Sequence, residues 1–442
     1  MAKKKATQTS PFVPVEEQPY PIPENWCWVR LGALLTEIKN GTTIKQDKSS
    51  SGHWVTRIES LQNQTIDFNR LGSIVNGQEI KDTDWYMAGD IALSHINSAE
   101  HVGKTALITV DMLPLVHGMN LLRLRFYDSC VPAFFQYYSQ SFQYKDEIRA
   151  RINMAVNQVS INQKQISSLE FPLPPVPEQQ RIVDRIESLF AKLDEAKEKA
   201  QAVVDGYELR KSAILHKAFT GELTERWRNE NGESNLDWYA AKFSDVAEIK
   251  SNLVDPADYQ DFPHIAPDNI EKRTGILLEY HTIAEDGVKS GKHLFCAGQI
   301  LYSKIRPYLS KVVIVNFDGL CSADMYPINA KEDTRYLWYY MLSDEFLEQA
   351  SNAGSRSVLP KINQKELSKI IVQMTSLKEQ QAIVRILDDV FAKEQQAKEA
   401  AEAVLSQIDI MKKAILARAF RSELGTNDPA EENAAELLKT IL

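Results

Sequence analysis

The chain has 442 residues, of which 43% are hydrophobic and 25% are charged, and this balance predicts a soluble globular protein of about three domains. No apolar run approaches the ~18 residues of a membrane span, and the basic N-terminus lacks the apolar core of a signal peptide. The net charge of −9 argues mildly against a nucleic-acid partner, although a local basic groove can exist on an acidic protein. The four cysteines share no metal-binding spacing and fit reduced thiols in the cytoplasm.

In chain order, the sequence first predicts a disordered polar arm at residues 1–20 and a compact domain at residues 21–175. Short β-like runs in this domain are separated by Gly, Asn and Asp turns, and a helical pattern follows at residues 131–150. A long helix is expected within residues 176–235. Pro177 forbids an earlier helix start.

The pattern then restarts, and the two halves of the chain repeat one another. Residues 178–223 and 379–424 superpose without a gap at an offset of 201 (379 − 178), which is a true internal repeat. The sequence therefore predicts a second domain at 236–375, a second long helix at 376–424 and an acidic tail at 425–442. The expected fold class is α/β (α+β), with two globular domains separated by two long antiparallel coiled-coil helices in a pseudo-two-fold repeat.

Each long helix carries a heptad stripe, because apolar and small residues alternate at spacings of four and three. A helix of about 38 residues spans roughly 57 Å, which favours a spacer over a helix pair inside one ordinary domain. The predicted seams are Ile182, Ile186, Leu189, Leu193, Ala196, Ala200, Val203, Tyr207, Arg210 and Ile214 in the first helix, and Ile383, Leu387, Val390, Glu394, Ala397, Ala401, Val404, Ile408, Met411 and Ile415 in the second.

Patterns that resemble catalytic motifs are incomplete. Glu37-Ile38-Lys39 and Glu248-Ile249-Lys250 fit part of a nuclease site, but the first copy lacks the upstream carboxylate that a Mg²⁺ cage requires. Ser98–Thr105 ends like a phosphate-binding loop without its first glycine. No histidine pair has metal-binding spacing, and no dinucleotide or adenine-methyltransferase motif occurs. The sequence thus predicts no catalytic, cofactor-binding or metal site in this chain.

Polar, basic and aromatic side chains on the loops form the remaining candidate site. Arg and Lys read guanine edges, Asn and Gln read adenine, and Ser, Thr and Lys hold phosphates. Each residue alone is more often a solvated side chain, so the DNA-binding hypothesis rests on the set, with its strongest patch at Tyr302–Tyr308. The candidates are Thr42, Thr43, Lys45, Arg57, Gln62, Asn63, Gln64, His95, Lys104, Asn157, Gln158 and Ser160 in the first domain, and Lys292, His293, Ser303, Lys304, Arg306, Tyr308, Lys311, Ser355, Arg356 and Ser357 in the second.

Several motifs resemble the specificity subunit of type I restriction-modification systems. They are Leu173–Val183 (LPPVPEQQRIV), Glu379–Val384 (EQQAIV) and Lys211–Leu215 (KSAIL), while Pro23–Trp26, Gly89–Ser94 and Gln299–Tyr308 are similar to the target-recognition domains of that family. Thr375–Lys378 departs from the pattern, because it lacks the prolines that precede the first long helix.

The resemblance implies that each domain reads one half of a bipartite target in double-stranded DNA and that the helices set the gap between the halves. It implies two modification (methyltransferase) subunits docked on the helices and restriction (translocase and nuclease) subunits further out. S-adenosylmethionine, ATP and Mg²⁺ would then belong to these partners, and this chain would be a non-catalytic cytoplasmic subunit. Two alternatives stay open: a coiled-coil scaffold joining two protein-binding domains, and a nuclease or methyltransferase in its own right.

Overall fold

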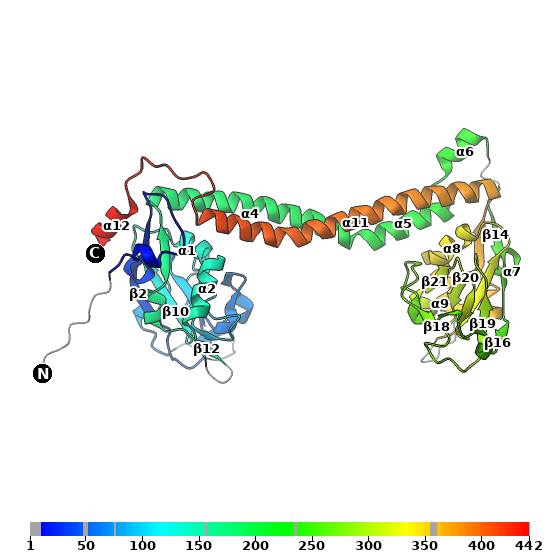
Figure 1. Cartoon of the computed structure of the whole chain (residues 1–442), viewed down its shortest axis with the longest axis horizontal. Helices are drawn as coiled ribbons and strands as arrows, with labels where there is room; N and C mark the ends of the chain where they lie inside the picture. The colour runs from blue at the N-terminus through cyan, green and yellow to red at the C-terminus, as the bar shows by residue number, and fades with distance from the viewer. Residues whose placement is uncertain are drawn as a thin grey trace. The chain divides into compact units, whose positions relative to one another are not determined.

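The computed structural model describes residues 10–46, 52–74, 77–154, 158–233, 237–353 and 360–441. The chain divides into two compact units (Figure 1). Unit 1 comprises residues 1–199 and 404–442, and unit 2 comprises residues 200–403. Unit 1 is therefore built from both ends of the sequence.

The domain of unit 1 is centred on a four-stranded antiparallel sheet. Its strand order is β2 (Leu35–Asn40), β10 (Leu121–Phe126), β7 (Ile91–Ser94) and β9 (Thr105–Leu107). All four residues of β7 are buried, as expected for a central strand with an apolar sequence. Two short helices, α1 (Pro132–Tyr138) and α2 (Phe142–Arg151), contribute aromatic side chains to the same core.

Unit 2 repeats this sheet with the same strand order. The order is β15 (Ala247–Ile249), β23 (Met325–Ala330), β20 (Ile300–Ser303) and β21 (Val312–Ile314). Helices α8 (Thr334–Leu342) and α9 (Asp344–Ala353) take the places of α1 and α2. The predicted internal repeat is confirmed, and it extends beyond the long helices to the whole scaffold of each domain.

The sequence echoes between the halves have structural reasons. Asn162 and Asn363 cap the short helices α3 (Gln163–Ser167) and α10 (Gln364–Leu367), and each forms a reciprocal capping box with hydrogen bonds of 2.9 Å. The next strands, β13 (Glu170–Leu173) and β24 (Ile371–Met374), pair with β1 (Cys27–Arg30) and β14 (Tyr239–Lys242). In both units a buried tyrosine, Tyr138 or Tyr340, donates a 2.9 Å hydrogen bond to a carbonyl of this strand.

The two units differ in the segments inserted between these shared elements. Unit 1 carries small strand pairs and ladders, namely β3 (His53–Val55) with β6 (Gly72–Ile74), β4 (Leu61–Gln62) with β5 (Thr65–Ile66), and β8 (Ile96–Asn97) with β12 (Val159–Ser160) and β11 (Asn153–Met154). Unit 2 carries a five-stranded sheet instead, in the order β16 (Leu253–Val254), β19 (Lys292–Phe295), β22 (Gly319–Cys321), β17 (Pro263–Ile265) and β18 (His281–Thr282). One scaffold therefore supports two different sets of loops.

The long helices differ from the predicted ones at their ends and middle. The first helix, α4 (Val176–Asp205), begins before Pro177, because proline is tolerated in the first helical turn, where its missing N–H has no partner to lose. It stops at Gly206, and α5 (Tyr207–Phe219) continues after that break. The second helix, α11 (Leu377–Ala419), is unbroken over 43 residues. The shorter helices α6 (Glu225–Asn231), α7 (Phe243–Val246) and α12 (Ala434–Ile441) complete the set.

Within each unit the long helices pack antiparallel, as predicted. In unit 1, Arg181 pairs with Glu431 beyond the end of α11 at 2.8 Å, and Asp194 pairs with the earlier Lys412 at 2.6 Å. In unit 2, Arg210 of α5 pairs with Glu394 of α11 at 2.8 Å.

The seam of α11 departs from the predicted register. The predicted positions Ala401, Ile408 and Ile415 are buried or half-buried, but Ala397, Val404 and Met411 are exposed. Lys398, Leu405 and Lys412, each one residue later, are half-buried instead. The Nζ atoms of Lys398 and Lys412 lie 4.9 and 5.0 Å from the ring centroids of Tyr207 and Phe190, respectively. A straight helix drifts about 20° per heptad, and one extra step of four residues takes up this drift.

Two further expectations differ from the structure. Residues 10–20 do not form a disordered arm: the N–H of Val13 donates to the carbonyl of Trp28 at 3.0 Å, and Val13 is buried. The predicted helix at 131–150 is two helices, because Ser141 caps a new one by accepting from the N–H of Tyr144. The acidic tail belongs to unit 1, where α12 buries Leu438 in the core.

Candidate nucleic-acid interface

One hollow of unit 1 brings together Thr43, Lys45 and Arg57. It has a volume of about 320 Å³ and is also lined by Asn120. Thr43 and Lys45 are exposed, whereas Arg57 is half-buried and pairs with Glu59 at 3.2 Å. The fourth candidate of this segment, Thr42, is 8% exposed, and its N–H donates to the carbonyl of His117. Thr42 thus anchors the loop that presents its neighbours.

The predicted residues Gln62, Asn63 and Gln64 form the tip of the hairpin β4–β5. Asn63 and Gln64 have positive φ values of 46° and 60°, as a two-residue hairpin turn requires. Their side chains are exposed, while the backbone carbonyl of Gln64 accepts a 3.2 Å hydrogen bond from Gln136. The tip is therefore fixed by the fold, and its amide groups project from it.

Lys104 is exposed at the start of β9 and lines a hollow with Asn63 and Gln64, and a second one with Gln62. His95 is half-buried, and burial lowers the pKa of its imidazole, which is therefore neutral at pH 7.

The remaining candidates of unit 1 lie near β12. Ser160 is half-buried in this strand, opposite Ile96 of β8, and Gln158 is exposed just before the strand. Asn157 lies outside the described residues.

In unit 2, five candidates are held by their own domain. His293 is 3% exposed, and burial, followed by repulsion from Lys304, lowers its pKa. The other four donate hydrogen bonds within the unit: Lys292 to the Ser290 hydroxyl at 2.7 Å, Ser303 to the Ile305 carbonyl at 3.1 Å, Lys304 to the Ala323 carbonyl at 2.6 Å, and Lys311 to the Pro267 carbonyl at 2.6 Å. In this conformation these five side chains stabilise the fold of unit 2.

Arg306 and Tyr308 are the candidates of unit 2 that face solvent. Arg306 has a positive φ of 48°, and its carbonyl accepts from the N–H of Leu309, which closes a tight turn. Tyr308 lies on this turn and is 50% exposed. The rigid turn presents one guanidinium and one ring. Ser355, Arg356 and Ser357 lie outside the described residues.

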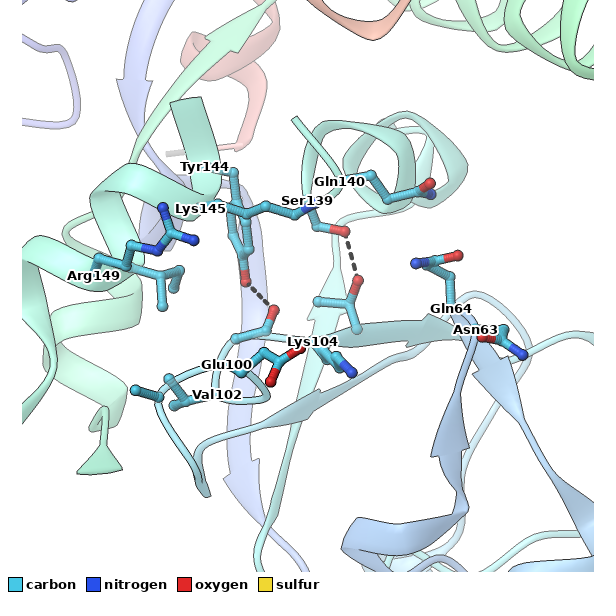
Figure 2. Close-up of a pocket in the computed structure, with 14 residues that line it drawn as sticks. Asn63, Gln64, Glu100, Val102, Lys104, Ser139, Gln140, Tyr144, Lys145 and Arg149 are labelled. Carbon is cyan, nitrogen blue, oxygen red and sulfur yellow. Dashed lines mark hydrogen bonds between the residues drawn. The ribbon is translucent and has the colours of Figure 1, made fainter. Parts of the chain in front are cut away.

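Two cations of α2 were not among the predicted site residues. Lys145 and Arg149 line the same hollow as Asn63, Gln64 and Lys104 (Figure 2). Their spacing of four residues places them on one helix face, which was a usable signal. Their neighbours in space, however, come from segments far away in the sequence.

The incomplete catalytic motifs have structural roles. Glu37 pairs with the buried Arg123, and Lys39 donates to Asp84 at 2.9 Å. In unit 2, Glu248 pairs with Lys250 at 2.7 Å. Ser98–Thr105 forms a turn that leads into strand β9 rather than into a helix.

Across the part of the chain that the structure describes, no group of three or more His, Cys, Asp or Glu residues is placed to hold a metal ion. In the same residues, no helix is both long and apolar enough to cross a membrane.

Comparisons with known proteins agree with this two-unit architecture. A family model described as "Type I restriction modification DNA specificity domain" matches the chain twice, at residues 23–204 and 235–404. The chain is 40% identical over 310 residues to the type I restriction enzyme EcoDI specificity subunit of Escherichia coli, which covers 64% of this chain and 70% of that protein. It is 37% identical over 221 residues to the putative type I restriction enzyme MjaX specificity subunit of Methanocaldococcus jannaschii, covering 47% and 51%. The HsdS subunit from Thermoanaerobacter tengcongensis has the same fold, with a TM-score of 0.65, 18% identity and coverage of 93% and 100%.

Proposed function

As a member of the type I restriction-modification DNA specificity family, the chain is a DNA-recognition subunit, and we propose that units 1 and 2 each read one half of a bipartite DNA target. The observation that carries the proposal is the shared sheet order of the two units beside their unrelated insertions. A shared scaffold holds the two sets of loops at equivalent positions of their units, and loops of different sequence select different bases.

The base-reading surfaces are the exposed loops of each unit. In unit 1 these are the hollows lined by Thr43, Lys45 and Arg57 and by Gln62 and Lys104. In unit 2 the turn with Arg306 and Tyr308 is the strongest described candidate. The buried Ser303 supports the turn of unit 2, because its hydroxyl donates to the carbonyl of Ile305, next to Arg306.

The long helices provide the spacer and the docking surface for partners. At about 1.5 Å per residue, the 43 residues of α11 span roughly 64 Å, and major-groove faces recur about every 34 Å. The acidic and polar outer positions of the long helices suit contact with protein better than contact with DNA. Two modification subunits would dock there, with restriction subunits joining the assembly.

Catalysis would belong to these partners, which would carry S-adenosylmethionine, ATP and Mg²⁺. The carboxylate and the cation of the incomplete nuclease-like motif are used in structural pairs, Glu37 with Arg123 and Lys39 with Asp84. Such an assembly would work on the host chromosome in the cytoplasm, where reduced thiols suit the four described cysteines, all free of disulfides.

A genome-wide map of N6-methyladenine, with and without this gene, tests the proposal. We expect methylation to disappear at one split motif when the gene is deleted. Restoring the gene should restore the mark. An unchanged map, together with no duplex binding by the complex of this chain and its modification subunits, would contradict the proposal and favour a protein-binding scaffold.

A further inference from the structure

A polar hollow of unit 1 lies between three segments that are distant in the sequence. It has a volume of about 320 Å³. The hairpin tip contributes Asn63 and Gln64, the turn before β9 contributes Lys104, and α2 contributes Lys145 and Arg149, and their side chains surround a common space (Figure 2). A ligand in this space would meet amide and cationic groups from three sides.

The cations of this hollow are unpaired within the described part of the chain. Lys104, Lys145 and Arg149 form no salt bridge there, and their side chains make no hydrogen bond to the chain. The pKa of Lys145 is lowered, first by partial burial of its ammonium group and then by repulsion from Lys413, Arg149 and Lys104. Glu100 also lines the hollow and offsets only part of this charge. An anion would relieve the repulsion.

The walls of the hollow are held firmly. The hydroxyl of Tyr144 donates to the carbonyl of Gly103 at 2.9 Å, and the hydroxyls of Thr105 and Ser139 lie 2.5 Å apart (Figure 2). Gly103 has a positive φ of 82°, and a Cβ there would lie 2.9 Å from Ile148 of α2. The turn and the helix are thus in close contact, which preorganises the cations that they carry.

Unit 2 shows that the scaffold does not need unpaired cations at these positions. Lys311 corresponds to Lys104, because their carbonyls accept from Ser303 and Ser94 in the same register, yet Lys311 binds the carbonyl of Pro267. Ser141 and Ser343 cap α2 and α9 in the same way and so align the two helices. In this alignment Leu347 is equivalent to Lys145, and Ser351 is equivalent to Arg149. The basic hollow is therefore a property of unit 1 and has a reason other than folding.

We propose that this hollow of unit 1 is a phosphate site and that its ligand is a backbone phosphate of the bound DNA duplex. The inference rests on the proposed function. Lysine and arginine neutralise the phosphate, and the amides of Asn63, Gln64 and Gln140 supply neutral donors. Such a contact fixes the register of unit 1 on the duplex without reading a base.

The test compares two charge-matched double variants of the full chain, each assembled with its modification subunits. Lys145→Leu with Arg149→Ser installs the residues of unit 2 in the hollow. Lys164→Ser with Lys365→Ser removes two exposed lysines at equivalent positions of α3 and α10. Binding to the cognate duplex is measured by fluorescence anisotropy over a series of salt concentrations, after thermal melts confirm that the variants are folded.

We expect the hollow variant to bind roughly tenfold more weakly, with the slope of log K against log salt smaller by about 1 and with unchanged discrimination between cognate and mutated half-sites. The control variant should keep the wild-type slope. Glu100→Gln should strengthen binding at low salt, because it removes the opposing carboxylate. Equal slopes for the hollow variant and wild type would overturn the phosphate site.

A scan of single neutral methylphosphonates along the duplex locates the contact. One position, at one half-site only, should weaken the wild-type complex and leave the hollow variant unaffected. If every position affected both proteins equally, or if inorganic phosphate alone bound the wild-type complex below millimolar concentrations, the DNA backbone would not be the ligand. If the wild-type complex preferred no duplex at all, the proposed function itself would fail, which is a different result.

Discussion

Units 1 and 2 solve the same structural problem with different chemistry. In unit 1, Asp90 accepts from the N–H of Met87 and binds Arg125 through two hydrogen bonds of 2.7 Å. In unit 2 the equivalent Gln299 accepts from the N–H of Cys296 and binds Asn329 at 2.8 Å. The scaffold thus requires an acceptor for the turn and a partner on the neighbouring strand, but the charge is optional.

The second short helix gives another case. Glu147 of α2 accepts a 2.9 Å hydrogen bond from the N–H of Glu170, and Gln349 of α9 accepts one of the same length from Ile371. The buried position needs an oxygen, and unit 2 supplies a neutral one. Unit 1 therefore carries more buried charge at matched positions, and its stability should depend more on partners and on pH.

The largest expected effect is at the charged pair. Asp90→Asn should destabilise unit 1 by about 3–5 kcal/mol, because it removes the nearer counter-ion of Arg125 and leaves Arg125 and the buried Arg123 with Glu37 alone. Gln299→Ala should cost unit 2 only about 1–2 kcal/mol, since no charge is left behind. Urea denaturation combined with hydrogen exchange assigns each loss to its unit.

The control is the double variant Asp90→Gln with Arg125→Asn, which recreates the pair of unit 2. It should recover most of the stability lost in Asp90→Asn. Equal losses in Asp90→Asn and Gln299→Ala would contradict the distinction between charged and neutral scaffolds.

The next effect concerns the equivalent buried glutamates at the start of α4 and α11. Burial raises the pKa of Glu178 despite hydrogen bonds from Thr426 and Arg181. Burial also acts on Glu379, but hydrogen bonds from Thr224, Thr375 and Arg228 outweigh it and lower the pKa.

The signs therefore oppose one another. Glu379 stabilises unit 2 above its unfolded pKa, and this contribution is lost as the pH falls through its folded pKa. Glu178 favours unit 1 most at low pH, and this contribution is lost as the pH rises through its raised pKa.

Glu379→Gln should cost unit 2 about 2–3 kcal/mol at neutral pH, since Arg228 loses its buried partner, and should remove the acid sensitivity. Denaturation at several pH values measures both. Loss of stability on acidification in Glu379→Gln as steep as in wild type would rule out this glutamate as its source.

A smaller effect is expected at Glu147, where the dependence of stability on pH has the opposite sign to that at Glu379. Burial raises the pKa of this carboxyl to about 7. The native state therefore binds the proton more tightly than the unfolded state, and stability falls as the pH rises from the ordinary value of glutamate to about 7.

Glu147→Gln should stabilise unit 1 by about 1–2 kcal/mol above pH 7 and should leave stability near pH 4 unchanged. Loss of the ion pair with Arg151 reduces the gain in stability above pH 7. Gln349→Glu is the matched control in unit 2 and should introduce the same pH dependence there. If neither exchange altered the dependence of stability on pH, the comparison between α2 and α9 would be wrong.

The smallest effect is at the break between α4 and α5. Gly206 has helical dihedrals, and an added Cβ would meet the flexible end of Arg210 at 2.6 Å and the backbone carbonyl oxygen of Ala202 at 3.1 Å, so a shift of a few tenths of an ångström would accommodate it. Gly206→Ala should therefore stabilise unit 2 by about 0.5–1 kcal/mol and raise helicity in circular dichroism. A decrease in stability would show that the hydrogen bond from Arg210 to the Val203 carbonyl depends on the break.

The sequence predicted the features that depend on local spacing or on the repeat. The heptad stripe, the antiparallel helices and the duplicated domain are confirmed because periodicity and the 201-residue offset carry them. The seam at Lys398 and Lys412 was missed, because a lysine over an aromatic ring does not look apolar.

The candidate site was harder to predict. The sequence predicted Ser303 and Lys292 as free polar residues, but they are buried in strands β20 and β19. No local pattern distinguishes a buried polar residue from an exposed one here. Lys104 and Lys145 meet only because the turn before β9 packs against α2. Likewise, the tail could not be assigned to unit 1, because the contacts of α12 are made with segments some 400 residues away.

The most direct test of independent reading exchanges residues 236–375 for the matching segment of a relative with a different target and maps methylated adenines in the host. Units that read independently should yield a motif in which one half is new and the other half is unchanged. A motif altered in both halves would show that the two units do not read the target separately, which would contradict the assignment of one half-site to each unit.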